Sequence, residues 1–201
     1  MKLRWSPTSP YTRKVTVTAI ETGLDGRIDR VLTIPAKAPD LAKENPLGKV
    51  PTLILDDGGT LVDSPVIVEY LDSLHSGEKI VPPAGPARWK ALKLEALADG
   101  IMDAAVSRIG EIRRPEQYQW PDWIAKQKTV VARTLDLLEA EAKGFDQKPT
   151  IGQLTVAIAL DYLDFRFGAD DWRKGRPNLT AWHRTFGERP SLKATMPKEP
   201  S

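Results

Sequence analysis

Two short segments place hydroxyl and carboxylate side chains at predicted helix starts. Ser9 directly precedes Pro10, and proline is common at the first position of a helix. Asp63 and Ser64 directly precede Pro65. A helix N-terminus offers backbone amides and a partial positive charge that bind a carboxylate. Ser64 adds a hydroxyl there and Asp63 can pair with an ammonium group, or the two can be a plain helix cap and a solvated turn acid.

The composition excludes several other kinds of site. The 201 residues include no cysteine, which rules out a disulfide scaffold, a zinc ribbon, an iron–sulfur site and an enzyme with its own thiol nucleophile. This also agrees with a reducing compartment. The 29 Lys and Arg residues against 27 Asp and Glu give a net charge of +2, which is no argument for nucleic-acid binding. The carboxylates show no metal-ligand spacing, so we expect no metal.

No stretch of the chain approaches the roughly 20 apolar residues that a membrane-spanning helix needs. The N-terminal residues contain no apolar run of signal-peptide length. We therefore expect a cytoplasmic protein that does not bind a membrane.

The chain divides into two parts that differ in pattern. Residues 1–76 mix short β-rich runs with helical ones, whereas residues 86–201 show helical periods and almost no strand signal. The intervening segment, 77–85, is rich in proline and glycine and is interpreted as a linker. A chain of this length accommodates two such domains.

The first part predicts the element order β-α-β-α-β-β-α. Strands are expected over Leu3–Trp5, Arg27–Leu32, Pro51–Leu55 and Thr60–Val62, and helices over Pro10–Thr22, Ala38–Glu44 and Ser64–Leu74. The sequence between the last two strands, 56–59, is a strong hairpin turn. Ser64 is expected to be the N-cap of the third helix, with Pro65 at its first position.

The second part predicts an all-helical bundle. Helices are expected over Pro86–Arg113, Asp122–Lys143, Thr150–Phe165 and Pro177–Phe186. Thr150 and Gln153 form a capping box, in which each side chain bonds the backbone amide of the other residue. The run that follows is apolar nearly all round, so this helix is expected to be the buried centre of the bundle.

Four segments, in order along the chain, resemble the glutathione transferases. Ser9–Lys14 stands where a thioredoxin-like fold places Cys-Pro-x-Cys, and Asn45–Leu53 (NPLGKVPTL) resembles the family's Gly-Lys-Val-Pro segment. Asp63–Leu71 resembles its acid-Ser-x-x-Ile-x-x-Tyr-Leu helix start, and Thr150–Arg166 looks like its buried bundle helix. Gln153 replaces the usual Asp of the capping box, and because glutamine also serves there, we expect the fold to be kept.

The resemblance implies a thioredoxin-like N-terminal domain, an all-helical C-terminal domain and glutathione as co-substrate. Asp63 would pair with the ammonium of glutathione, and Ser64 would hold its γ-glutamyl carboxylate. Val50 would pair through its backbone with the cysteinyl part, and the Val50–Pro51 bond is cis in this family. Lys49 would reach the glycyl carboxylate, or it would simply be exposed, the more common fate of a lysine.

Ser9 is the residue that the resemblance places at the catalytic position. A thiolate is the nucleophile, and its pKa falls near a helix N-terminus and a hydroxyl donor. A serine in place of cysteine argues against glutaredoxin-like thiol exchange. The hydroxyl groups that remain alternatives to Ser9 are those of Ser6, Thr8, Tyr11 and Thr12.

We therefore expect attack of glutathione thiolate on a small electrophile, as conjugation, peroxide reduction or dehalogenation. The helical domain would supply the electrophile pocket through Met102, Val106, Ile109 and Arg113, although the same residues can be plain core. The competing class is a non-catalytic scaffold of the same fold. The resemblance, and apolar residues on more than one side of the first two bundle helices, predict a homodimer.

Overall fold

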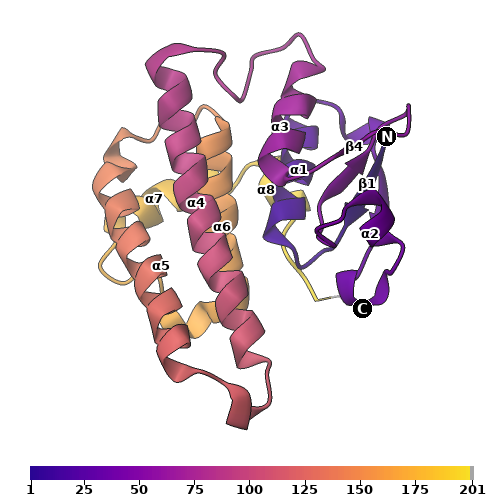
Figure 1. Cartoon of the computed structure of the whole chain (residues 1–201). Helices are drawn as coiled ribbons and strands as arrows, with labels where there is room; N and C mark the ends of the chain where they lie inside the picture. The colour runs from indigo at the N-terminus through magenta and orange to yellow at the C-terminus, as the bar shows by residue number, and fades with distance from the viewer. Residues whose placement is uncertain (200–201) are drawn as a thin grey trace. The chain divides into compact units, whose positions relative to one another are not determined.

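The computed structural model describes residues 1–199 and divides into two compact units (Figure 1). The sheet unit consists of residues 1–81 together with the segment from Pro190 onward, and the helical unit consists of residues 82–189. The sequence pattern predicts that everything after residue 85 belongs to the helical domain. The contacts differ at the C-terminus, because the segment that begins at Pro190 packs on the sheet unit.

Within the described residues, four short strands form the mixed sheet of the sheet unit. They are β1 (Lys2–Trp5), β2 (Asp29–Leu32), β3 (Thr52–Ile54) and β4 (Thr60–Leu61), in the spatial order β2-β1-β3-β4. β1 pairs parallel with β2 and antiparallel with β3, and β3 pairs antiparallel with β4. The element order and the thioredoxin-like fold are thus confirmed.

The second strand begins later than the expected Arg27. Residues Asp25–Arg27 instead form a 3₁₀ turn, which closes when the Ile28 amide donates to the Asp25 carbonyl. Pairing with β1 starts only at Asp29, opposite Lys2. Ile28 is buried with the core of the unit, so its apolar signal comes from the turn rather than from the strand.

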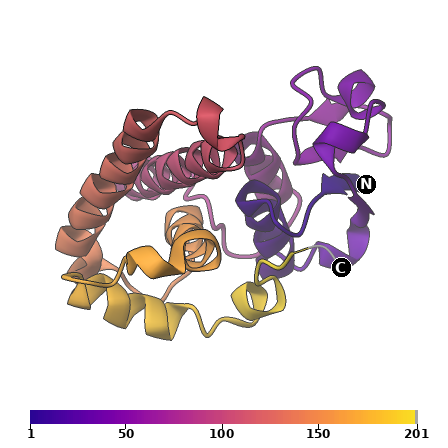
Figure 2. The ribbon, with the colours of Figure 1, turned by 90° about the horizontal axis from the view of Figure 1, so that it is seen from below.

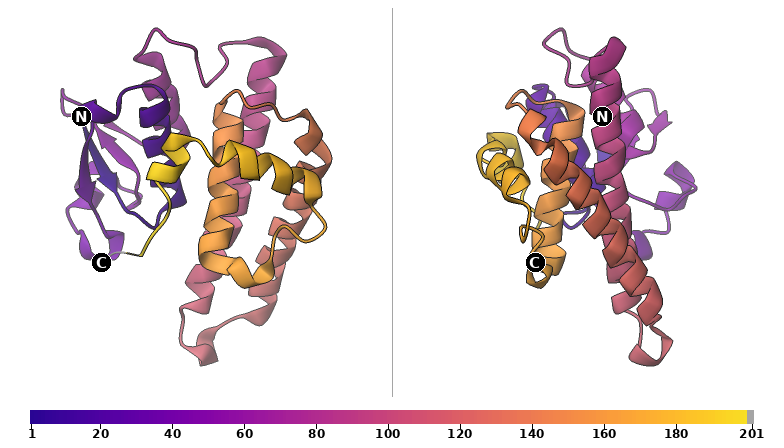
Figure 3. Two further views of the ribbon diagram at one scale, coloured as in Figure 1. Left: turned by 180° about the vertical axis from the view of Figure 1, so that it is seen from behind. Right: turned by 90° about the vertical axis from the view of Figure 1, so that its left-hand side faces the viewer.

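Helices α1 (Pro10–Glu21) and α3 (Ser64–Ser73) lie together on one side of the sheet (Figure 3). Their apolar faces close a core between helices and sheet, made of Leu3, Val15, Ala19, Leu24, Ile28, Leu53, Ile67 and Leu71. The short helix α2 (Leu41–Glu44) starts three residues after the expected Ala38 and follows a 3₁₀ turn at Pro35–Lys37. Arg4 of β1 fastens α2, since its Nε donates to Glu44 at 2.6 Å and its Nη2 to Asp40 at 2.6 Å.

The helical unit contains α4 (Gly85–Ile112), α5 (Pro121–Glu141), α6 (Ile151–Phe167) and α7 (Pro177–Phe186). Figure 2 shows α6 between α4, α5 and α7, and every residue from Ile151 to Leu163 is buried. Gly152 lets α6 approach α4 closely, because a Cβ atom there would lie 2.4 Å from the carbonyl oxygen of Ala91. The predicted capping box is present, with the Thr150 amide 3.2 Å from Gln153 Oε1.

The C-terminal helix α8 (Pro190–Ala194) was not predicted, since five residues leave almost no periodic signal. It packs on α1 of the sheet unit. The buried Arg13 of α1 donates from Nη2 to the carbonyl of Leu192 at 2.9 Å and from Nε to Thr195 Oγ1 at 3.2 Å. No helix within residues 1–199 is long and apolar enough to cross a membrane.

Candidate glutathione site

Three loops of the sheet unit meet at one edge of its sheet. β3 runs antiparallel to β1 with Thr52 opposite Arg4, so the residues before β3 lie beside those that follow β1. β4 runs antiparallel to β3 with Leu61 opposite Leu53, so the residues that follow β4 lie at the same edge. The pairing therefore gathers the segments 6–9, 49–51 and 62–64, which hold all the residues expected to bind glutathione.

Ser9 is the N-cap of α1, as the sequence predicts. Its Oγ accepts a hydrogen bond from the amide of Thr12 at 3.3 Å, and its carbonyl accepts from the amide of Arg13 at 3.1 Å. The side chain is half-buried, and its hydroxyl proton has no acceptor among residues 1–199. Ser9 can therefore cap the helix and still donate a hydrogen bond to a bound anion.

The neighbouring hydroxyl groups differ in availability. Thr12 is fully buried and donates to the carbonyls of Ser6 at 2.7 Å and Ser9 at 3.0 Å, so its proton is already engaged. The hydroxyls of Ser6 and Thr8 lie 3.2 Å apart and bond to each other. Tyr11 is half-buried on α1. Thr12 is therefore the least available of these hydroxyls, whereas Ser9 and one member of the Ser6–Thr8 pair each keep a proton without an acceptor in the described part of the chain.

The loop before β3 is organised by Asn45, which was not among the predicted site residues. Asn45 is buried, and its Nδ2 donates to the carbonyl of Lys49 at 2.9 Å and to Thr52 Oγ1 at 3.0 Å. Its Oδ1 accepts from the amide of Leu47 at 2.9 Å. Gly48 follows with a φ of 61°, in the left-handed region that glycine adopts most easily. The Asn-Pro-x-Gly pattern is the turn signal that could have indicated this role.

This loop presents the other residues expected to contact glutathione. The Val50–Pro51 peptide bond is cis, as the resemblance implies. Val50 is half-buried and Pro51 is buried. The side chain of Lys49 is exposed and makes no hydrogen bond or ion pair within the described residues, which agrees with either of its two expected roles.

The start of α3 differs by one residue from the expectation. The N-cap is Asp63, not Ser64, and the Asp63 carboxylate accepts a hydrogen bond from the Ser64 amide. Both residue types cap helices well, so sequence alone does not separate them. As the first residue of the helix, Ser64 is 1% exposed, and its Oγ has no hydrogen-bond partner in the described part of the chain. Because buried hydroxyls are rarely left unpaired, Ser64 is a candidate for a ligand contact.

The residues expected to form the electrophile pocket lie on α4 or directly after it but are not equally accessible. Met102 is fully buried, as a core residue would be, and Ile109 is half-buried. Val106 is 37% exposed, and Arg113, just past the end of α4, is exposed. Among residues 1–199, no group of three His, Cys, Asp or Glu side chains is close enough to hold a metal ion.

Comparisons with known proteins agree with this geometry. Residues 8–74 match the glutathione S-transferase N-terminal domain and residues 121–185 match its C-terminal domain. An uncharacterised GST-like protein of Escherichia coli, YibF, is 35% identical over 98% of each chain.

Solved structures show the same fold over the same length. A glutathione transferase family member from Pseudomonas fluorescens with bound glutathione is 42% identical and superposes with a TM-score of 0.94, covering 98% of this chain and 99% of that one. A structure of such a protein from the same organism with bound S-(propanoic acid)-glutathione is 41% identical with a TM-score of 0.92, covering 99% and 100%. From these matches along nearly the whole chain, the protein belongs to the glutathione S-transferase family.

Proposed function

We propose that the protein is a glutathione transferase in which the glutathione thiolate attacks a small electrophile. The observation that carries the proposal is the buried, unpartnered hydroxyl of Ser64 at the start of α3. The half-buried hydroxyl of Ser9 and the cis Val50–Pro51 loop reach the same sheet edge, and similar proteins bind glutathione and an S-substituted glutathione.

In this proposal each part of glutathione has its own partner. The γ-glutamyl carboxylate accepts a hydrogen bond from Ser64 and is stabilised by the positive end of the α3 dipole. The exposed Asp63 carboxylate pairs with the ammonium group, and Lys49 reaches the glycyl carboxylate. The backbone of Val50 pairs with the cysteinyl part, as an added strand would. These contacts hold the tripeptide so that its sulfur faces Ser9.

Ser9 activates the thiol by stabilising its ionised form. The Ser9 hydroxyl donates to the sulfur, while the α1 dipole adds a partial positive charge, and together they lower the pKa of the bound thiol. The thiolate then gives an electron pair to the electrophilic carbon to form a C–S bond. In a substitution the leaving group departs with the pair of the broken bond, and in an addition the product carbanion takes a proton.

The electrophile is bound, in this proposal, by Val106, Ile109 and Arg113 of the α4 region, with Met102 behind them. Val106 and Ile109 offer partly exposed apolar surface, and Arg113 offers an exposed cation. A screen of electrophiles with glutathione would name the reaction among conjugation, peroxide reduction and dehalogenation.

Glutathione binding can be tested through the variant Ser64→Ala. The hydroxyl of Ser64 has no protein partner, so its removal should leave the melting temperature of the free protein unchanged or slightly higher. Its loss should weaken glutathione binding about ten- to hundredfold, because a hydrogen bond to a charged group is worth roughly 1.5–3 kcal/mol. The matched control is Ser73→Ala, at the other end of α3, where the hydroxyl bonds the Tyr70 carbonyl.

The competing function is a non-catalytic scaffold of the same fold. A ligand at 100 times its Kd stabilises the folded state by about 2.7 kcal/mol, so millimolar glutathione should raise the melting temperature of the native protein. Absence of any shift would favour the scaffold, as would binding without turnover of any electrophile in the screen.

A further inference from the structure

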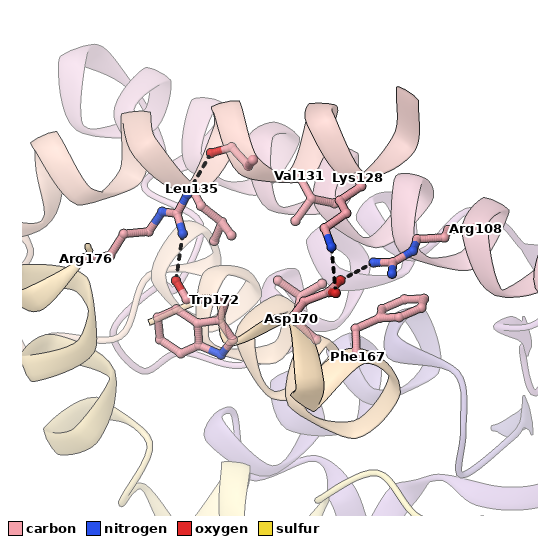
Figure 4. Close-up of a pocket in the computed structure, with 10 residues that line it drawn as sticks. Arg108, Lys128, Val131, Leu135, Phe167, Asp170, Trp172 and Arg176 are labelled. Atoms are coloured by element: carbon pink, nitrogen blue, oxygen red, sulfur yellow. Dashed lines mark hydrogen bonds and ion pairs between the residues drawn. The ribbon is translucent and has the colours of Figure 1, made fainter. Parts of the chain in front are cut away.

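The helical unit contains a small cavity of about 80 Å³ that no part of the proposed reaction uses (Figure 4). It lies between α4, α5, α6 and the segment that follows α6. Its apolar walls are Val131, Ala132, Leu135, Leu163, Phe167 and Trp172, and its charged residues are Arg108, Lys128, Asp170 and Arg176. None of the four residues expected to bind the electrophile lines it.

Three cations and one anion line the cavity, and once Arg176 is paired with Asp136, which lies outside the lining, one positive charge remains in excess. Arg108 of α4 and Lys128 of α5 both bond the carboxylate of Asp170, with Lys128 Nζ 2.9 Å from Oδ1. Arg176 is balanced separately, since its Nη2 lies 2.6 Å from the carboxylate of Asp136. One carboxylate, Asp170, thus faces two cations.

Asp170 itself stays ionised at neutral pH. Its partial burial acts to raise its pKa, but the hydrogen bonds from Arg108 and Lys128 outweigh this and lower it. The excess charge on the cavity is therefore positive over the physiological range.

Both cations keep hydrogen-bond donors that no described residue accepts. Arg108 bonds Asp170 through Nη1, which leaves other N–H donors of its guanidinium group without an acceptor within residues 1–199. The guanidinium carbon lies 3.9 Å from the centre of the Phe167 ring, which orients the group. Lys128 bonds Asp170 through one of its three donors. The pair can therefore bind a second anion without releasing Asp170.

We propose that this cavity binds a short-chain aliphatic carboxylate of roughly two to four carbon atoms. A monoanion would balance the excess charge, with its oxygens accepting from Arg108 and Lys128. Its alkyl end would lie against Val131, Leu135 and Leu163.

The enclosed space of the cavity is too small to hold a larger ligand completely. A cavity that holds benzene measures about 150 Å³ and drug-sized ligands need about 300 Å³ or more, against about 80 Å³ here. An aromatic acid or glutathione would therefore extend beyond the cavity.

Propionate is the probe that tests the proposal. Titration of the full-length protein, followed by ligand-observed NMR, should show one saturable site with a Kd of roughly millimolar, as expected for so few atoms. S-methylglutathione at saturation should not displace propionate, which separates this cavity from the glutathione site. Displacement by S-methylglutathione, binding that never saturates, or equal binding of 1-propanol would overturn the proposal. Displacement by an equal concentration of chloride would do so too, since the alkyl end would then contribute nothing.

Two variants keep the test independent of folding defects. Arg108→Met should weaken propionate binding about ten- to hundredfold, and Ala132→Leu should do the same by filling the cavity while all charges remain. Arg133→Met, which removes an exposed cation of α5 outside the cavity, is the matched control and should bind as the native protein does. If the two cavity variants, checked for folding by circular dichroism, bind propionate as tightly as the control, the site does not exist.

Discussion

At the scale of single residues, the hydrogen bonds at the sheet edge separate structural roles from chemical ones. Thr12 and Asn45 are both buried, and their polar side-chain groups form hydrogen bonds within the protein. Ser9 keeps a hydroxyl proton without an acceptor, and Ser64 keeps a hydroxyl without any partner, among residues 1–199. The first pair fixes the backbone of the site, and the second pair remains available to a ligand.

We expect Ser9→Ala to lower turnover about ten- to hundredfold while glutathione affinity stays nearly unchanged. The lost hydrogen bond to a charged sulfur is worth roughly 1.5–3 kcal/mol, and each 1.36 kcal/mol is a factor of ten in rate. The pKa of the bound thiol, followed by the ultraviolet absorbance of the thiolate, should rise with the loss of rate.

Stability must be measured alongside, because loss of the α1 N-cap costs about 1 kcal/mol by itself. Asp63→Ala provides the contrast, since its proposed partner is the ammonium group, and it should weaken binding first. An unchanged thiol pKa in Ser9→Ala would transfer the catalytic role to Tyr11, Ser6, Thr8 or a backbone amide.

We expect Asn45→Asp to weaken glutathione binding by about tenfold with a smaller effect on turnover at saturation. The substitution keeps the shape and the acceptor for Leu47 but removes the donor to Lys49 and Thr52, each bond being worth about 0.5–1.5 kcal/mol. The loop that carries Val50 would then lose its internal support. Calorimetric titration with glutathione measures the effect, and Lys43→Ala on the exposed surface of α2 should show none.

At the scale of elements, the sequence was sufficient to predict a helix and its cap wherever the periodic pattern and the capping residues fell within one segment. The capping box of α6 joins Thr150 to Gln153, and the Pro177–Phe186 helix was predicted with its observed bounds. The predictions were wrong or incomplete where the bounds or the presence of an element depend on residues far away in the sequence. The start of β2 is fixed by pairing with β1, and α8 is held by Arg13, nearly the whole chain length away.

The site shows the same division between local and distant signals. The motifs that carry Ser9, Val50 and Ser64 are local, so their resemblance to the family was visible in the sequence. The function of Asn45 depends on bonds to Lys49 and Thr52 across a turn, and the cavity around Asp170 gathers residues from four segments. Neither arrangement leaves a periodic pattern.

We expect Glu139→Gln to destabilise the helical unit by about 1 kcal/mol at pH 7, as the loss of a charged cap does. Glu139 of α5 accepts from the amides of Asn178 at 3.1 Å and Leu179 at 2.8 Å, so it caps the start of α7 from another helix. Its burial acts to raise its pKa, but these hydrogen bonds outweigh it and lower the pKa below the ordinary 4.5.

A lowered carboxyl pKa gives stability that is present above the ordinary value and is lost as the pH falls through the folded-state value. The difference between native protein and variant, measured by urea unfolding, should therefore be full at pH 7 and shrink below about pH 4.5. The exposed Glu116→Gln serves as control. A difference that does not depend on pH would mean that the carboxylate charge contributes nothing.

At the scale of the whole molecule, the apolar surface is uneven. Trp89 of α4 is 68% exposed and makes no ring contact among the described residues. Trp120 is 59% exposed, but it stacks on Trp123 with the ring centres 6.0 Å apart, so its position is explained within one chain. A large apolar side chain without such a neighbour is the kind of residue that protein interfaces bury.

We expect the protein to be a homodimer in which Trp89 is buried against the partner. Sedimentation at micromolar concentration should give twice the chain mass of 22.3 kDa. Trp89→Glu should shift the equilibrium toward monomer, because a charge placed in an apolar contact loses its hydration without gaining a partner. Trp120→Glu, the matched control, should remain dimeric.

A native protein that sediments as a monomer would contradict the dimer, and a dimeric Trp89→Glu would keep the dimer but place its interface on another surface. Because α4 carries both Trp89 and the residues proposed to bind the electrophile, turnover of the monomeric variant would then show whether α4 needs the partner for its position.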